Sequence, residues 1–579
     1  MRPDVVVILT DQERAAPPYE TDALREWRER SLPGRRWFAE HGVTFRRHYT
    51  GSLACAPSRP TLFTGQYPDV HGVTQTDGLG KDADDSGMRW LRPTEVPTLG
   101  HWFRAAGYDT YYQGKWHLSH ADLHDAGSGR SLATNDDDGN VDTMAAAQYA
   151  AADRLDEFGF SGWIGPEPHG PALANSGLRR DPLTAARVVA WLEDRYARRQ
   201  RGDADAQRPF LVVASFVNPH DIVLFPLWSR NDPFGDAHGD VPEVPPSPTA
   251  DEDLTAKPRA QRAYRAAYPT GYAPLPTDVY EERAAEYRRL YYRLHAEVDG
   301  AIDAVRRAVT DGDSDDAVLV LTADHGELLG AHGGLHQKWF NLYDEATRVP
   351  FVIAGVGSRP TRARVIESAP TSHVDIVPTL LSVAGIDSSR VAEELTGRFT
   401  ELHPLPGRDL MPIVNGTGDV PADRAVYLIT RDNILEGDTG ASPAARVLGL
   451  GAAPPDNMRI SVPADTAASF EAIVVADEGR VWKLARTFDD PATWTEPGVR
   501  HLAASGADGD RYREQPLADE WELYDLMDDP IEAINRWETT PDDLRLRLTD
   551  RLAVERARHV PARHQPWPYA TRRAVGVGS

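Results

Sequence analysis

Continuous aliphatic runs recur along the first part of the chain. Residues 5–10, 210–216 and 317–322 are apolar or β-branched at almost every position. Such runs are typical of strands buried on both faces of a parallel sheet, because strands with one wet face alternate apolar and polar residues. Shorter runs at 108–112 and within 342–355 indicate further strands.

Amphipathic helices are expected between these strands. Apolar residues recur at helical spacing in 184–199 and 280–309, and residues 22–40 indicate a helix that breaks at Pro33 and Gly34. The alternation predicts an α/β fold with a large, mostly parallel sheet flanked by helices.

The pattern changes at residues 400–425, where Pro, Gly and Asp cluster. Shorter alternating strands follow, at 425–429, 471–475 and 481–487. A chain of 579 residues also exceeds one ordinary core. We therefore predict a large α/β domain of residues 1–415 and a smaller C-terminal domain of residues 416–579, with an antiparallel sheet and a terminal helix.

Two long polar stretches interrupt the pattern. Residues 119–180 are rich in Asp, Gly, Asn and His, and residues 226–280 are rich in Pro. Because loops of this length are usually functional, we expect them to wall a substrate pocket, the second as a surface excursion or lid. Their aromatic residues could stack on an aryl or sugar group or pack at the surface; they include Trp163, Phe225 and Trp228.

Composition narrows the class of partner. The net charge is −25 and the isoelectric point about 5.2, which disfavours nucleic acid and anionic membranes. No apolar run approaches the roughly 20 residues of a membrane span. The chain opens on a strand and has one cysteine, Cys55, so we expect a cytoplasmic protein without disulfides.

Polar side chains of catalytic type follow the predicted strands. They are Asp11 and Gln12, Lys115 and His117, His220, and Asp324 and His325. The carboxyl ends of parallel strands meet at one edge, where open α/β sheets bind ligands. Any one of these residues could instead cap a helix or pack in the core, but an adjacent Asp324-His325 pair followed by Gly326 is hard to explain that way. We predict one shared site.

Cys55 lies in the stretch 51–73, which reads GSLACAPSRPTLFTGQYPDVHGV. A tight turn leading into a helix places the thiol at the helix N-terminus, where the dipole and Arg59 favour an anion. Most free cysteines are buried and inert, yet the glycine, prolines and arginine around this one indicate a function.

The stretch CAPSRPTLFTG resembles the C-x-P-S-R-x-x-x-L-x-T-G signature of the type I sulfatases in the alkaline phosphatase superfamily. Further segments resemble the same family in the same order: GKWHL at 114–118, SFVNPH at 215–220, HVDIVPTL at 373–380 and ELYDLMDDPIE at 522–532. The resemblance spans essentially the whole chain. It implies an alkaline phosphatase-like fold.

The resemblance also implies a mechanism. In the family, the cysteine is converted to formylglycine, whose hydrated aldehyde attacks sulfur. One divalent metal would be held by Asp11, residue 55, Asp324 and His325, with Gln12 as a further candidate. Arg59 would orient the nucleophile, Lys115 and Lys338 would bind the sulfate, His117 would assist the deprotonation that expels the covalent sulfate, and His220 would protonate or stabilise the leaving alkoxide.

Two departures from the commonest family pattern matter. Asp11-Gln12 and Asp324-His325 stand where many sulfatases carry Asp-Asp and Asp-Asn. A less anionic, partly nitrogen site weakens the case for Ca²⁺ and admits Mn²⁺, with Mg²⁺ as a third choice. Choline sulfatases and phosphonate monoester hydrolases resemble this chain at both pairs, but those hydrolases generally lack the Lys-x-His pair that Lys115 and His117 supply.

The expected function is therefore that of an arylsulfatase-like sulfuric ester hydrolase acting on sulfate monoesters. The alternative is a phosphonate monoester or phosphodiester hydrolase at the same site. A binding protein that keeps Cys55 as a thiol would not need Pro57 and Arg59, and a related mutase would need Ser or Thr at position 55. The expected partners are a small sulfate ester and a formylglycine-generating enzyme, with the oligomeric state left open.

Overall fold

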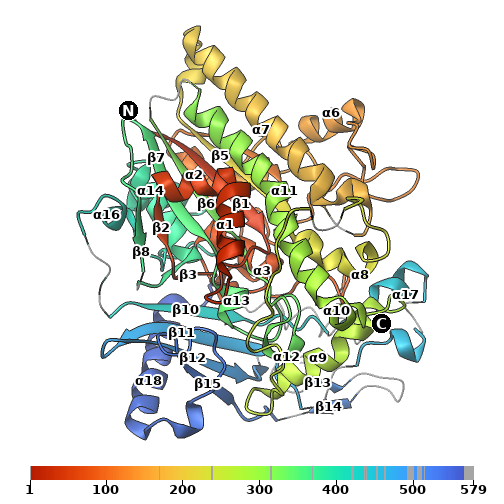
Figure 1. The fold of residues 1–579 in the computed structure, drawn as a ribbon. Helices are drawn as coiled ribbons and strands as arrows, with labels where there is room; N and C mark the ends of the chain where they lie inside the picture. The colour runs from red at the N-terminus through yellow and green to blue at the C-terminus, as the bar shows by residue number, and fades with distance from the viewer. Residues whose placement is uncertain are drawn as a thin grey trace.

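A seven-stranded sheet forms the centre of the molecule (Figure 1). The computed structural model describes residues 2–565 apart from residues 86, 169, 237–238, 313–315, 368, 419–420, 422, 436, 438–439, 451–453, 462–464, 492–500, 505–510 and 514. The strand order is β4 (Asp109–Gly114), β5 (Phe210–Pro219), β1 (Asp4–Asp11), β6 (Asp316–Ala323), β7 (Phe351–Gly357), β2 (Val43–Phe45) and β8 (Arg364–Ile366).

The pairing is mostly parallel, as predicted. β4, β5, β1 and β6 run parallel to one another, β7 is antiparallel to β6 and to β2, and β8 is parallel to β2. The carboxyl ends of β1, β4, β5 and β6 therefore lie at the same edge of the sheet.

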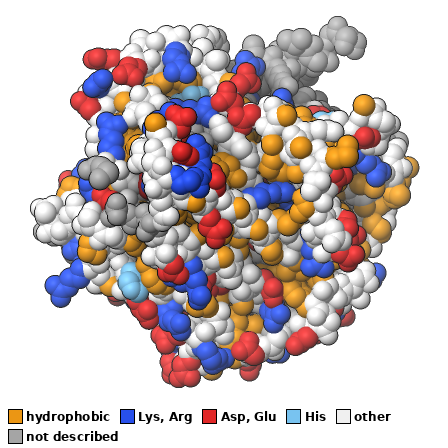
Figure 2. Space-filling view, turned by 90° about the horizontal axis from the view of Figure 1, so that it is seen from above, with side chains coloured by type: hydrophobic (Ala, Val, Ile, Leu, Met, Phe, Trp, Pro, Cys, Tyr) orange, Lys and Arg blue, Asp and Glu red, His pale blue; other side chains and the backbone are white. Residues whose placement is uncertain are grey.

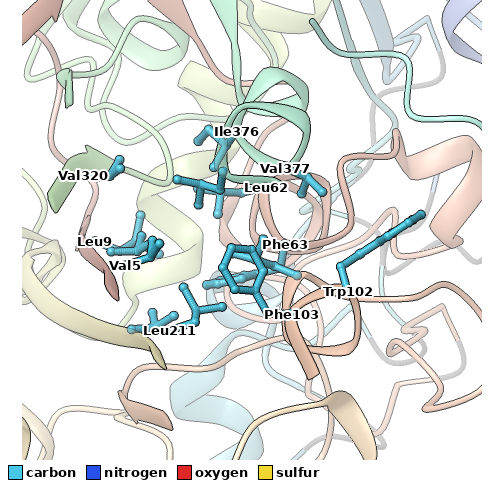
Figure 3. Packing of buried hydrophobic residues seen from close by; sticks show 14 of the residues in the cluster. Val5, Leu9, Leu62, Phe63, Trp102, Phe103, Leu211, Val320, Ile376 and Val377 are labelled. Atoms are coloured by element: carbon cyan, nitrogen blue, oxygen red, sulfur yellow. The ribbon is translucent and has the colours of Figure 1, made fainter. Parts of the chain in front are cut away.

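Successive side chains of β1 divide between two cores, as the two-residue period of a strand requires. Val6 and Ile8 pack with α2 (Pro33–His41), α7 (Gly177–Gln200) and α11 (Ala284–Thr310). Val5, Val7 and Leu9 belong to the opposite core, with α3 (Cys55–Thr64), α5 (Leu99–Ala105) and α14 (Ile376–Val383). Figure 3 shows Leu62 and Phe63 of α3 among the strand residues and the side chains of α14.

Most predicted helices form with small changes at their ends. The break at Pro33 separates α1 (Asp22–Ser31) from α2, and the predicted helix 280–309 divides into α10 (Val279–Glu282) and α11. Shorter elements complete this part of the chain: β3 (His48–Tyr49) paired with β9 (Thr371–Ser372), α4 (Pro68–His71), α6 (Thr143–Ala152), α12 (Ala331–Gly334), α13 (Asp344–Thr347), α15 (Ser388–Leu395) and α16 (Met411–Val414).

The interpretation of residues 226–280 as a surface excursion is wrong for part of that stretch. It contains α9 (Arg259–Tyr272), and Tyr264 and Tyr268 of this helix are buried beside Tyr287 of α11. Aromatic residues four positions apart form one helix face, a signal that the prolines and charges around it concealed. The aromatic residues considered as substrate contacts are also core residues: Trp163, Phe225 and Trp228.

The C-terminal part forms a four-stranded antiparallel sheet, as predicted. Its order is β10 (Ala425–Thr430), β11 (Ser469–Asp477), β12 (Arg480–Phe488) and β15 (Glu520–Asp525). One face packs against α18 (Asp542–His559), and the other joins the core that holds α9. Further elements are α17 (Pro443–Val447) and the paired strands β13 (His501–Ala504) and β14 (Arg511–Arg513). The domain division at residue 415 stays a prediction.

The surface carries charges of both signs. Figure 2 shows acidic, basic and hydrophobic side chains interspersed over the face seen from above. Within the described residues, every helix is too short or too polar to cross a lipid bilayer.

Candidate active site

The predicted site residues meet at the carboxyl edge of the parallel strands. Asp11 ends β1, Asp324 and His325 follow β6, and His220 follows β5. Lys115 and His117 follow β4, and Lys338 comes from the loop after α12. All of them are buried except His220, which is half-buried. Residues more than 300 positions apart thus contact one another across adjacent strands.

Helix α3 presents Cys55 to this edge. Cys55 is its first residue, every residue of the helix is buried, and the helix ends at Gly65 with φ of 65°. The positive end of the helix dipole therefore lies at the sulfur. Burial alone would raise the pKa of the Cys55 thiol, but Lys115, Lys338 and His325 bring that pKa well below its ordinary value. Position 55 is built to hold an anion.

Arg59 holds the two aspartates of the site. Its guanidinium lies 2.8 Å from Asp11 Oδ2 and, through Nε, 2.9 Å from Asp324 Oδ2. Lys115 Nζ adds a contact of 2.7 Å to Asp11 Oδ2. Both Oδ2 atoms thus face cations, which leaves the Oδ1 atoms turned toward His325 Nε2, each at 3.7 Å.

The pKa values of the two aspartates are shifted in opposite directions. Burial and Cys55 oppose the charge of Asp11, but Lys115, His220 and Arg59 hold the pKa of that carboxyl well below its usual range. Burial and the neighbouring Asp11 raise the pKa of Asp324 to about 6. A cation bound beside Asp324, in addition to Arg59, would therefore stabilise the ionised form of both carboxylates.

His325 turns an imidazole nitrogen toward Cys55. Its Nδ1 lies 2.9 Å from the carbonyl oxygen of Gly326, to which it can donate, and its Nε2 lies 3.0 Å from Cys55 Sγ. A histidine whose other nitrogen is fixed in this way is typical of metal ligands.

The residues at this edge fit a divalent metal. The ligand atoms of Asp11, Cys55, Asp324 and His325 all lie within 4.8 Å of one another. Atoms that surround one ion at roughly 2.0–2.5 Å are separated by distances of this order. Carboxylate, imidazole and sulfur donors together suit a transition metal better than an all-oxygen site would.

Gln12 lies beside the cluster of Asp11, Cys55, Asp324 and His325, and its side chain contacts Lys338 and Glu327. Its Oε1 accepts a hydrogen bond from Lys338 Nζ at 2.7 Å, and its Nε2 donates to Glu327. Glu327 is fully buried and also accepts hydrogen bonds from Tyr287 Oη at 3.0 Å and from the Gln337 N–H at 2.8 Å. This network fixes the amide of Gln12 with its oxygen toward Lys338.

Two lysines approach the sulfur from different segments. Lys338 Nζ lies 3.4 Å and Lys115 Nζ 3.9 Å from Cys55 Sγ. Burial opposes the charge of Lys115, but Asp11 and Cys55 raise its pKa. Two ammonium groups in a buried site can bind the oxygens of a tetrahedral anion.

The pKa values of the two histidines near Cys55 are shifted in opposite directions. Burial would lower the pKa of His117, but Asp77 outweighs it and raises that pKa to about 9. Burial and Lys115 lower the pKa of His220 to about 3. Cys55 acts to raise the pKa of both rings. At neutral pH the site therefore holds a neutral His220, whereas Asp77 and Cys55 together favour the charged form of His117 as long as residue 55 is a cysteine.

Sequence reasoning missed three residues of the site. Asp77 contacts His117, Glu327 holds Gln12, and Asp432 of the C-terminal part accepts from Trp339 Nε1 at 2.9 Å, next to Lys338. Glu327 follows the quoted Asp-His-Gly motif, which was a usable signal. Asp77 and Asp432 lie in polar loops without periodicity, so their contacts depend on the tertiary fold.

Comparison with known proteins identifies the relatives of this chain. The family model described as Sulfatase matches residues 3–386. The uncharacterized sulfatase YidJ of Escherichia coli (strain K12) is 28% identical over 66% of this chain, although the match spans only 65% of that protein's own length. The choline-sulfatase of Rhizobium meliloti (strain 1021) is 27% identical over 72% of this chain and 72% of its own length.

Solved structures share the fold. The phosphonate monoester hydrolase of Agrobacterium radiobacter superposes with a TM-score of 0.54 and 20% identity, over 96% of each chain. The predicted fold class, a large mostly parallel sheet with a small C-terminal antiparallel sheet, is thereby confirmed.

Proposed function

The chain belongs to the sulfatase family, and on that premise we propose that it hydrolyses sulfate monoesters to an alcohol and inorganic sulfate. The nucleophile would be a formylglycine made from Cys55. One observation carries the proposal: the sulfur of Cys55 lies within 3.9 Å of two lysine ammonium groups and 3.0 Å from the imidazole of a metal-type cluster. A sulfate ester needs such a combination, because attack on sulfur builds negative charge on its oxygens.

Formylglycine and a metal would supply what the side chains lack. The hydrated aldehyde offers a hydroxyl nucleophile at position 55, and a divalent metal held by Asp11, Asp324, His325 and residue 55 adds positive charge beside it. The imidazole of His325 favours Mn²⁺ over Ca²⁺, with Mg²⁺ as a third choice. Gln12 is a further candidate ligand through Oε1.

The cationic side chains of the site would bind the ester. Lys115 and Lys338 hold the sulfate oxygens, since both ammonium groups already contact the atom that occupies the reacting position. Arg59 keeps the two aspartates in place through its contacts with both Oδ2 atoms. Each role uses a contact that exists before substrate arrives, so little reorganisation is needed during the reaction.

The two histidines would handle protons and the leaving oxygen. His117 exchanges a proton with residue 55, the residue that acts with Asp77 to raise its pKa. His220 is neutral at neutral pH, and it donates a hydrogen bond to the leaving alkoxide while Lys115 supplies the charge. We propose a formylglycine-generating enzyme as the maturation partner and a small sulfate ester as substrate.

A phosphonate monoester or phosphodiester hydrolase at the same site is the second candidate. The Asp11-Gln12 and Asp324-His325 pairs favour it, and the fold is similar to that of the Agrobacterium radiobacter enzyme. The Lys115 and His117 pair favours the sulfatase, since both side chains interact with Cys55.

Kinetics on matched substrates test the proposal. Protein co-expressed with a formylglycine-generating enzyme is assayed on p-nitrophenyl sulfate and on p-nitrophenyl phenylphosphonate. We expect kcat/KM to favour the sulfate by about tenfold or more. A preference for the phosphonate would establish the second candidate, and turnover of neither substrate by fully matured, metal-loaded protein would refute both.

A further inference from the structure

Asp77 contacts the catalytic-site histidine His117. Asp77 Oδ1 lies 3.0 Å from His117 Nε2, and the aspartate side chain is only 14% exposed. Cys55 is among the groups that raise the pKa of His117. When one nitrogen of an imidazole is engaged by a carboxylate, the ring orientation and the position of its proton are both fixed. The Asp77 contact therefore determines which nitrogen of His117 serves residue 55.

The backbone around Asp77 is anchored by the C-terminal part of the chain. The N–H of Thr76 donates to Asp432 Oδ1 at 3.1 Å, and the N–H of Gly80 donates to the carbonyl of Ile434 at 3.0 Å. Lys81 Nζ is buried and donates to Gln75 Oε1 at 2.8 Å. The loop thus has fixed points on both sides of Asp77.

Arg446 closes the far side of the same loop. Its guanidinium donates to the carbonyl oxygens of Gly78 at 2.6 Å and of Lys81 at 3.3 Å, and it pairs with Asp82 at 2.7 Å. A loop held at this many points can keep a side chain in one position, which a catalytic partner requires.

The face of the His117 ring is also covered. Trp90 lies against it with ring centroids 5.4 Å apart. Asp77 therefore holds the histidine through Nε2, and Trp90 packs against its ring at an interplanar angle of 46°. Both contacts come from segments that carry none of the family motifs quoted above.

We propose that Asp77 is the positioning residue of His117, and that Asp432, Ile434 and Arg446 of the C-terminal part hold it in place. The inference rests on the proposed function, in which His117 exchanges a proton with residue 55. In that step the O–H bond of a hydroxyl on residue 55 breaks, and the proton bonds to Nδ1 of a neutral His117, which becomes the imidazolium. His117 keeps its Nε2–H, which stays hydrogen-bonded to Asp77, and the negative charge of Asp77 stabilises the imidazolium.

The first test separates kcat from KM on p-nitrophenyl sulfate. Asp77→Asn should lower kcat by about 100-fold, with KM changed by less than about threefold, because binding of the sulfate depends on the lysines. Asp77→Glu should restore at least about a tenth of the wild-type kcat, since it keeps the carboxylate. A kcat for Asp77→Asn within about threefold of wild type would overturn the proposal.

Asp84→Asn is the matched control. Asp84 lies on the same stretch of chain, but its side chain is 98% exposed and its nearest ion-pair atom, His120 Nε2, is 4.0 Å away. Its kcat should stay within about twofold of wild type. An equal loss in both variants would mean that the effect comes from the negative charge of the loop, against the proposal.

A double-mutant cycle distinguishes positioning from a structural role. If Asp77 acts through His117, then adding Asp77→Asn to the His117→Ala variant should not lower kcat any further. If Asp77 only stabilises the loop, the two losses should multiply, and the proposal would be wrong.

A readout without turnover separates this inference from the proposed function. In nitrogen-15 histidine-labelled protein loaded with the diamagnetic ion Mg²⁺, the Nε2–H of His117 should give a strongly shifted signal that disappears in Asp77→Asn and persists in Asp84→Asn. An unchanged His117 signal in Asp77→Asn would overturn the proposal. Wild-type protein that shows this change but hydrolyses no sulfate ester would refute the sulfatase function and still support the contact.

Discussion

Two clusters in the described part of the chain carry ligand-type side chains, and they differ in composition and burial. The first comprises Asp11, Cys55, Asp324 and His325, and the second comprises Glu401, His403 and His564. In the second cluster, Glu401 accepts hydrogen bonds from His403 Nε2 at 2.8 Å and from the N–H groups of His564 at 3.0 Å and Gln565 at 2.8 Å. These three hydrogen bonds hold the only carboxylate of the second cluster in place.

The first cluster brings four ligand-type side chains together. Arg59 contacts the Oδ2 atoms of Asp11 and Asp324, and Asp324 Oδ1 accepts from the N–H groups of Gln12 at 3.0 Å and His325 at 2.9 Å. One ligand atom of each of the four residues lies within 4.8 Å of the others. We call the second cluster the C-terminal latch, because it joins residues 563–565 to Glu401 and Arg563 also pairs with Glu95 at 2.7 Å. The first cluster thus has two carboxylates and a sulfur in a fully buried site, whereas the second has one carboxylate and an exposed His564. Residue types alone do not make a metal centre.

The strongest test of the first cluster replaces its nucleophile position. Cys55→Ala should reduce kcat/KM on p-nitrophenyl sulfate by about 10⁴-fold or more, because no other group can attack sulfur there. Far-ultraviolet circular dichroism should be unchanged, which would show that the fold persists. Activity within about tenfold of wild type would place the nucleophile elsewhere.

Lys115→Ala should have the next largest effect on turnover. Removal of the ammonium takes away one partner of Asp11 and one charge near the sulfur, so kcat/KM should fall by about 100- to 1,000-fold. The matched control is Lys257→Ala, since Lys257 is also buried but donates to Tyr524 Oη and Glu532 in the C-terminal part. Near-normal turnover in Lys115→Ala would contradict the assigned role.

Metal binding should distinguish the two clusters directly. Asp324→Asn should weaken binding of Mn²⁺ by about tenfold or more, whereas Glu401→Gln should leave it unchanged. Titration calorimetry on chelator-treated protein measures both. Loss of Mn²⁺ binding in Glu401→Gln, with Asp324→Asn normal, would reverse the comparison.

The C-terminal latch should contribute stability and little activity. Glu401 is fully buried and its oxygens accept three hydrogen bonds, so Glu401→Gln should lower the free energy of unfolding by about 1–3 kcal/mol. Urea denaturation gives this value, and kcat should stay within about twofold of wild type. A loss of kcat without a loss of stability would mean that the latch serves the site.

The smallest expected effect is the pH dependence of that stability difference. Burial would raise the pKa of Glu401, but His403 and the N–H groups of His564 and Gln565 lower it. A carboxyl with a lowered folded-state pKa stabilises the protein above its unfolded-state pKa and loses this effect as pH falls through the folded-state value. The difference between wild type and Glu401→Gln should therefore be largest at neutral pH and shrink in acid. A difference that grows in acid would contradict the lowered pKa.

Much of the sheet could be predicted from sequence, because buried strands and amphipathic helices have local signals. The runs at 5–10, 210–216 and 317–322 became β1, β5 and β6 with changes of a few residues at their ends. Helix α9 escaped prediction because its buried face consists of tyrosines within a stretch rich in proline and charge.

The candidate site was predictable where motifs mark it and hidden where the tertiary fold makes it. Asp11, Cys55 and His325 were found from strand ends and the cysteine stretch. Asp77 and Asp432 were not, because loop 75–82 meets the end of β10 across more than 350 residues. Contacts of that kind leave no periodic trace in the chain.

The most direct test of the sulfatase account is to follow residue 55 and turnover together. Samples co-expressed with increasing amounts of a formylglycine-generating enzyme are analysed by mass spectrometry of the peptide that contains residue 55 and by kcat on p-nitrophenyl sulfate. The account predicts that activity rises in proportion to the fraction of formylglycine and extrapolates to zero for the thiol. Full activity in protein that contains only Cys55 as a thiol would contradict it.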